Sequence, residues 1–126
     1  MVHLKPQRVA LALLAPAALL VGASEAQAHA HLVSATPAPN ATAAAGVKAI
    51  TLRFNEPVMA RFSGFDLTGA NGAKVATSPV SVDPKGRKAL TANLTAPLAA
   101  GAYKVSWHVV SADTHKMQGT YSFKVH

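Results

Sequence analysis

The chain has 126 residues, a length that is enough for one domain. Its formal net charge is +7. It contains no cysteine, so disulfide bonds, thiolate metal sites, thiol nucleophiles and iron–sulfur clusters are excluded. Any metal would have to be bound through nitrogen, oxygen or thioether ligands.

The first segment has the features of a secretory signal peptide. Two basic residues precede an apolar run over residues 9–21, which is shorter than the roughly 20 residues of a membrane-spanning helix. The tripeptide Ala-Gln-Ala that ends at Ala28 fits the small-x-small pattern of a signal-peptidase site. We therefore predict that residues 1–28 are a signal peptide and that residues 29–126 form one exported domain. An uncleaved membrane anchor is the alternative.

The exported part is basic, but its charges do not form a binding surface for nucleic acid. Lysines and arginines are scattered along residues 29–126, and they cluster only at residues 85–88. We interpret them as a solubilising surface. No second apolar run is long enough to span a membrane, so we expect a mature protein that is not embedded in one.

The pattern after residue 29 is that of short strands separated by turns. Asn71-Gly72 and Asp83-Pro84-Lys85-Gly86 are typical turn sequences, because Asn and Gly accept positive φ and Pro presets φ. Alternating apolar residues predict strands over residues 32–35, 47–54, 62–68, 74–82, 88–94, 101–111 and 119–125. Seven strands without a helical period predict an all-β domain, a seven-stranded Greek-key β-barrel or sandwich.

The candidate metal ligands are His29, Asp113 and His115. Cleavage after Ala28 would give His29 a free amine beside its imidazole, and the two can chelate one metal in a six-membered ring. Nitrogen donors in a square plane suit Cu(II). His115 would add a third nitrogen and Asp113 an oxygen from the same loop, provided that the first strand brings His29 close to it. Zinc would compete for such a site.

Other residues offer different copper chemistry. His31 is third from the new terminus, so the amine, two deprotonated amides and its imidazole could surround Cu(II) if the terminus were flexible. Glu56 could orient a metal-bound histidine or amine through a hydrogen bond. Met59 and Met117 are isolated thioethers. We expect packing as the role of Met59, whereas Met117 lies beside the candidate loop.

Three blocks of the sequence resemble the CopC family of periplasmic copper-binding proteins. They are His29–Pro37, Leu52–Val58 and the stretch from Gly101 through His115, with Gly119 after it. The resemblance implies a seven-stranded Greek-key β-barrel of cupredoxin-like or immunoglobulin-like type. It also implies a periplasmic protein that buffers or carries copper, often alongside the inner-membrane protein CopD.

The resemblance implies a Cu(II) site formed by His29, through amine and imidazole, with Asp113 and His115. It places Glu56 near this site. Some members have a second, methionine-rich Cu(I) site at the opposite end of the barrel. The matching region here, residues 69–84, has neither methionine nor histidine, so we expect one Cu(II) site.

We therefore expect a non-enzymatic Cu(II)-binding protein for copper buffering, resistance or delivery. No hydrolase or transferase motif is present. Two alternatives remain open at this level. One is an oxidase or monooxygenase that uses an N-terminal histidine and a second histidine as a copper brace. The other is an immunoglobulin-like interaction module whose histidines bind no metal.

Overall fold

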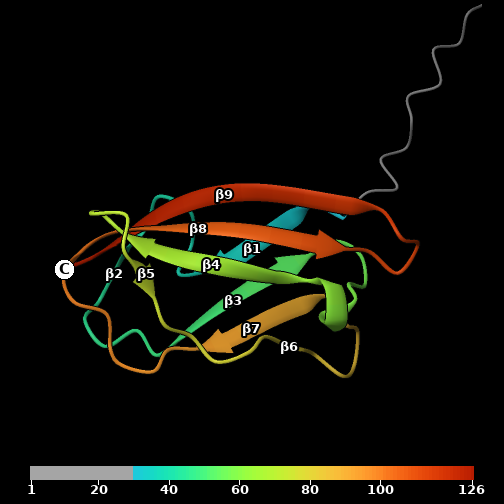
Figure 1. The fold of residues 1–126 in the computed structure, drawn as a ribbon, viewed down its shortest axis with the longest axis horizontal. Coiled ribbons are helices and arrows are strands. Elements are labelled where there is room, and N and C mark those ends of the chain that lie inside the picture. Colours follow the sequence, from blue (N-terminus) through green and yellow to red (C-terminus); the bar gives the residue numbers. More distant parts are fainter. Residues whose placement is uncertain (1–29) are drawn as a thin grey trace, which may run out of the picture.

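The computed structural model describes residues 30–126, which form two β-sheets packed face to face (Figure 1). One sheet has the strand order β1-β3-β7-β6, with β1 at Leu32–Thr36, β3 at Ala49–Phe54, β7 at Ala89–Asn93 and β6 at Ser81–Val82. The other has the order β2-β9-β8-β4-β5, with β2 at Thr42–Ala43, β9 at Lys116–Val125, β8 at Gly101–Val110, β4 at Gly64–Gly69 and β5 at Lys74–Val75. A short 3-10 helix, Ala60–Phe62, precedes β4. Within this part of the chain, no helix is long and apolar enough to cross a bilayer.

The all-β prediction is confirmed, and the core follows the predicted alternation. Every second residue of the long strands is buried or partly buried, because successive side chains of a strand point to opposite faces. These inward residues come from both sheets and form one cluster, which includes Ile50, Leu52, Phe54, Leu90, Val105, Trp107, Val109 and Phe123.

Trp107 connects the two sheets and requires a glycine beside it. Its ring contacts Phe54 of the opposite sheet edge-on, with 5.1 Å between ring centroids. Across β8 and β9, Trp107 is paired with Gly119. A Cβ atom at Gly119 would lie 2.5 Å from Cζ2 of Trp107, so only glycine leaves room for the indole.

The strand boundaries differ most from the prediction over residues 74–82. The strand expected over residues 74–82 is two strands of two residues each, and they lie in different sheets: β5 pairs with β4, and β6 pairs with β7. Pro79 lies between them and has no N–H for a continuous ladder. This split and the short strand β2 give nine strands within residues 30–126 instead of seven.

The β8–β9 hairpin is longer than expected. Strand β9 begins at Lys116 rather than at Gly119, and ten residue pairs join it to β8, from Gly101 with Val125 to Val110 with Lys116. Only residues 111–115 remain for the turn. The candidate residues Asp113 and His115 are thus placed at the tip of a long, regular hairpin.

Strand β1 is the outermost strand of its sheet and contains an irregularity. Leu32 pairs with Phe54 and Ser34 pairs with Arg53, so Val33 is an extra residue in the ladder. Its side chain is 59% exposed. The start of β1 lies at the same end of the molecule as the β8–β9 turn, on the right in Figure 1.

Candidate metal centre

Three segments meet at one end of the sandwich: the start of β1, the segment 55–58 after β3, and the β8–β9 turn. Asn55 donates its N–H to the carbonyl oxygen of His31 at 3.2 Å. Ala112 donates its N–H to the carbonyl oxygen of Pro57 at 3.0 Å, and Val58 bridges to Ser111. Segment 55–58 is therefore hydrogen-bonded on one side to the start of the described chain and on the other side to the turn.

Asp113 and His115 form a side-chain pair at the tip of the hairpin. His115 Nδ1 lies 3.0 Å from Asp113 Oδ2. Both side chains reach solvent, with 42% of Asp113 and 50% of His115 exposed. A proton on Nδ1 that is donated to the carboxylate leaves the lone pair on Nε2, as in carboxylate–histidine–metal arrangements. The spacing D-x-H therefore gives a carboxylate and an oriented imidazole in direct contact.

The turn itself holds this pair in place. Thr114 has φ +73°, a left-handed conformation that is unusual for a β-branched residue. Its N–H donates to the carbonyl oxygen of Ser111 at 2.8 Å, and the N–H of Ser111 donates to the carbonyl oxygen of His115 at 3.0 Å. These bonds close a tight turn in which Asp113 and His115 flank Thr114.

Ser111 is fully buried beneath the pair, and its hydroxyl donates to Asp113 Oδ1. This hydrogen bond is the main reason why the pKa of Asp113 is lowered from its ordinary value, and the hydrogen bond to His115 is the second. Bonds to the charged form favour ionisation. The carboxylate thus stays negative into acid, and each oxygen keeps a lone pair for a further partner.

The start of the described chain is anchored at two points. The methyl group of Ala30 is fully buried in the core. The N–H of His31 donates to Asn55 Oδ1 at 2.7 Å, in addition to the bond from Asn55 to the His31 carbonyl. The His31 side chain is exposed. These contacts fix the backbone at residues 30–31 next to segment 55–58.

Of the other predicted site residues, the structure describes Glu56 but not His29. His29 lies outside the described residues. Glu56 is half-buried in segment 55–58, and within residues 30–126 it makes no hydrogen bond or ion pair. Residues 30–126 also contain no cluster of three or more His, Asp or Glu side chains that could hold a metal ion. The structure therefore brings together Asp113 and His115 and places the backbones of Glu56 and His31 nearby.

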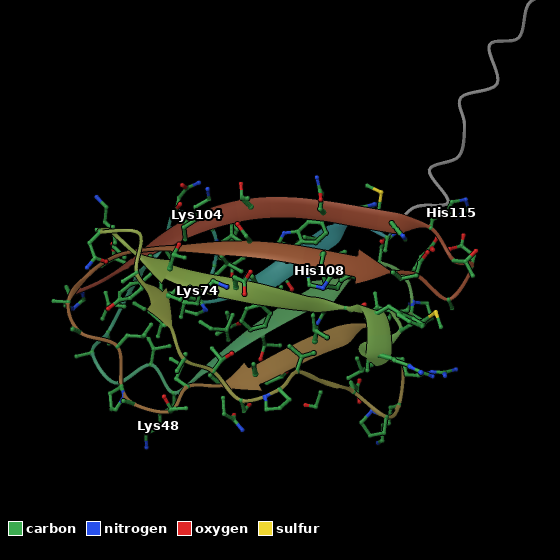
Figure 2. The ribbon with its side chains drawn as sticks, viewed as in Figure 1. Lys48, Lys74, Lys104, His108 and His115 are labelled. Atoms are coloured by element: carbon green, nitrogen blue, oxygen red, sulfur yellow. The ribbon has the colours of Figure 1, made fainter. Side chains whose placement is uncertain are left out.

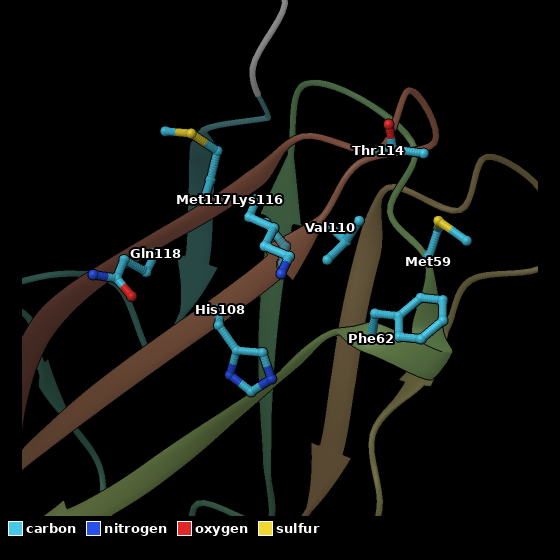
Figure 3. A pocket seen from close by; sticks show the side chains of 9 residues that line it. Met59, Phe62, His108, Val110, Thr114, Lys116, Met117 and Gln118 are labelled. Atoms are coloured by element: carbon cyan, nitrogen blue, oxygen red, sulfur yellow. The ribbon is translucent and has the colours of Figure 1, made fainter.

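An apolar groove runs along the outer face of the five-stranded sheet beside the turn (Figure 3). Met59 and Met117 both line it, but their thioether ends lie on opposite sides of Val110 and Lys116 (Figure 3). The exposed His108 lies over Gly64, where a Cβ atom would be 3.2 Å from its Cε1. The methionines thus do not form a thioether pair, and His108 lies on the surface of the sheet.

The lysines labelled in Figure 2 lie away from the candidate centre. Lys48, Lys74 and Lys104 occupy the left half of the view, whereas His115 lies at the right-hand end (Figure 2). Lys116 is the cation that directly follows His115 in the sequence. The acidic residues at this end are Asp113 and Glu56, and Arg87 is a basic residue beside them, since its carbonyl oxygen accepts the N–H of Val58 at 2.7 Å.

Two residues that shape the centre were missed by the sequence analysis: Ser111 and Asn55. Ser111 stands two residues before Asp113, and Asn55 immediately follows a predicted strand, where Asn is a common turn residue. Their positions alone did not distinguish them from ordinary serines and asparagines. What distinguishes them is burial in one case and a backbone partner 24 residues away in the other.

Comparison with known proteins connects this geometry to a family. The CopC domain model matches residues 32–126. "Protein YobA" of Escherichia coli strain K12 is 44% identical over 98 residues, which cover 78% of this chain and 79% of that protein. "Copper resistance protein C" of Pseudomonas syringae pv. tomato is 40% identical over 126 residues, covering 94% of this chain and 96% of that protein. The crystal structure of CopC from Methylosinus trichosporium OB3b superimposes with a TM-score of 0.72 at 31% identity, covering 77% of this chain and 93% of that one.

Proposed function

This chain belongs to the CopC family, and we propose that its processed form, starting at His29, binds one Cu(II) ion in the periplasm. The ligands are the amine and imidazole of His29, the imidazole of His115 and the carboxylate of Asp113, with Glu56 nearby. The observation that carries the proposal is the contact between Asp113 and His115 at a turn that shares segment 55–58 with the start of the chain.

The distance from the anchored backbone supports His29 as a partner of this pair. His31 is bonded to Asn55, and Ala112 is bonded to Pro57. Two residues of extended chain span at most about 7 Å, so the proposal asks His29 to reach only a short way from the anchored His31. Without cleavage after Ala28, residue 29 would have no free amine, and the proposed chelate would not form.

The donor set fits Cu(II) as cargo. Nitrogen donors with one carboxylate favour a tetragonal ion, and copper lies at the top of the affinity order for such ligands. The pair is half exposed, which lets an ion enter and leave. We therefore propose buffering, resistance or delivery of copper rather than catalysis, with a CopD-like inner-membrane protein as the partner.

Titration with Cu(II) of the protein that starts at His29 tests the site. His115→Ala, Asp113→Ala and acetylation of the amine are each expected to weaken binding by at least about tenfold, the scale on which even supporting groups of a metal site act. His108→Ala is the matched control, because His108 is exposed on the sheet face, and it should leave binding unchanged.

Two results would contradict this function. Binding that is unaffected by His115→Ala or by a blocked amine would remove the assigned ligands. Reductant-dependent oxygen consumption well above that of free copper would favour the enzymatic alternative. Mass spectrometry of the exported protein shows whether the chain begins at His29.

A further inference from the structure

We infer that Asn55 selects the coordination mode of the metal: its side chain occupies the His31 amide that a competing Cu(II) mode would need. This inference rests on the proposed function and adds to it a positioning residue outside the ligand set. It starts from one hydrogen bond, the 2.7 Å bond from the His31 N–H to Asn55 Oδ1.

The chain has two ways to surround Cu(II) with nitrogen. In the first, His29 chelates through its amine and imidazole, and Asp113 and His115 complete the set. In the second, the amine, the amide nitrogens of Ala30 and His31, and the His31 imidazole form the square. Both use the terminal amine, so one molecule can adopt only one of them at a time.

The second mode requires changes at the backbone that the structure opposes. As each Cu–N bond forms, the amide nitrogen must lose its proton to water. The His31 amide proton is held by Asn55 Oδ1, so this bond must break first. The neighbouring bond from the Asn55 N–H to the His31 carbonyl, at 3.2 Å, holds the next peptide group, between His31 and Leu32, against segment 55–58.

Burial of Ala30 acts in the same direction. Its side chain is fully buried in the core cluster. Wrapping the Ala30 and His31 amides around an ion would turn this segment and withdraw the methyl group from its packing. The two anchors therefore hold residues 30–31 next to segment 55–58, which leaves the terminal amine and imidazole for the turn of Asp113 and His115.

The test uses the protein that starts at His29 in a background without the main site. In His115→Ala, Cu(II) affinity depends more heavily on the second mode. Adding Asn55→Ala removes the bond to the His31 amide and is expected to raise Cu(II) affinity about fivefold, the effect of one net hydrogen bond. Electron paramagnetic resonance should show four equatorial nitrogens, and visible absorption should move to shorter wavelength.

Three variants in the same background serve as controls. Asn55→Asp keeps an acceptor for the His31 N–H, so its spectrum should match that of His115→Ala alone; the spectrum is the readout here because the added charge by itself attracts Cu(II). Asn71 lies at the turn between β4 and β5, and its Oδ1 accepts the backbone N–H of Ala73 at 3.1 Å. Asn71→Ala therefore removes a similar hydrogen bond elsewhere and should leave Cu(II) affinity and spectrum unchanged. His31→Ala should abolish the four-nitrogen signal. Fluorescence of Trp107, the single tryptophan, reports whether each variant is folded.

The outcomes separate this inference from the proposed function. If Asn55→Ala leaves affinity and spectrum unchanged in the His115→Ala background, Asn55 does not select the mode. If the four-nitrogen signal persists after His31→Ala, the competing mode is misassigned and the inference fails as well. If His115→Ala leaves wild-type binding unchanged, the proposed function itself fails, whatever Asn55 does.

Discussion

At the scale of single residues, Ser111 controls the ionisation of Asp113 at the candidate centre. It is fully buried, and its hydroxyl donates to the carboxylate of Asp113. The hydroxyl is the main cause of the lowered pKa of Asp113. A ligand that stays ionised in acid can compete with protons for a metal over a wider pH range.

Ser111→Ala is expected to raise the pKa of Asp113 toward its ordinary value. In the wild type, the lowered pKa contributes stability above the unfolded-state pKa of about 4, and this contribution is lost as the pH falls through the folded-state pKa. The variant should therefore lose Cu(II) binding at a higher pH than the wild type does. Carboxyl chemical shifts and Cu(II) titrations between neutral and acidic pH measure both effects.

The control for this change is Ser122→Ala, on the exposed face of β9. It removes a serine hydroxyl that lies outside the turn. It should change neither the pKa of Asp113 nor the pH dependence of Cu(II) binding. An Asp113 pKa that does not move in Ser111→Ala would show that the buried hydroxyl has no role in ionisation.

At this scale, the sequence predicted which residue types could bind a metal, but it did not predict which residues hold them in position. The spacing of Asp113 and His115 suggested a shared loop, and the structure confirms that they are in contact. Ser111 and Asn55 depend on how distant segments meet, because a hydroxyl becomes a positioning group only when it is buried and aimed. His29 as a ligand stays a prediction.

At the scale of elements, the β8–β9 hairpin places the turn, and its regularity depends on Gly119. The indole of Trp107 lies across this residue, within 2.5 Å of where a Cβ would be. The same indole packs on Phe54 in the other sheet. A side chain at position 119 would therefore displace a contact between the two sheets.

Gly119→Ala is expected to lower the free energy of unfolding by about 2 kcal/mol, the usual range for an added methyl group in a filled core. Urea unfolding followed by Trp107 fluorescence measures it. Gly86→Ala is the matched control, because a Cβ there would meet only Cγ of Lys88, at 4.0 Å. Equal stability of the Gly119→Ala and Gly86→Ala variants would mean that the indole can move aside at little cost.

The long strands were predictable because their alternation is strong, and the short ones were not. In β8, Val105, Trp107 and Val109 are buried as the pattern required. Strands β5 and β6 are two residues each, and which sheet each joins depends on partners elsewhere in the chain. Local sequence carries no information about such pairing, so one continuous strand was expected there.

At the scale of the whole molecule, one polar group in the core lacks a partner. The hydroxyl of Tyr121 is buried without a hydrogen bond in the part of the chain that the structure describes. Burial raises the pKa of Tyr121 to about 12. An unpaired buried hydroxyl costs stability, since water satisfied it in the unfolded chain.

Tyr121→Phe is expected to raise the free energy of unfolding at neutral pH by about 1 kcal/mol. In the wild type, the raised pKa contributes stability that is intact below the unfolded-state pKa of about 10, and this contribution is lost as the pH rises toward about 12. The variant should therefore show a smaller loss of stability over that pH range. Chemical denaturation at several pH values tests this.

Tyr103→Phe provides the opposite control. The Tyr103 hydroxyl donates to the carbonyl oxygen of Ala99 at 2.6 Å, so its removal should destabilise the fold by about 1 kcal/mol. If both substitutions destabilise equally, the Tyr121 hydroxyl has a partner in solution.

The extra residue Val33 in the ladder of β1 and β3 also affects how readily two copies of the protein associate through their sheet edges. An outermost strand with a regular row of free N–H and C=O groups is a template for edge-to-edge pairing with a second chain. β1 cannot be hidden behind another element if the chain start beside it is to receive an ion. A bulge breaks the spacing of that row and twists the edge. The strand that leads from the candidate metal-binding end is therefore a poor template for aggregation while it stays open to solvent.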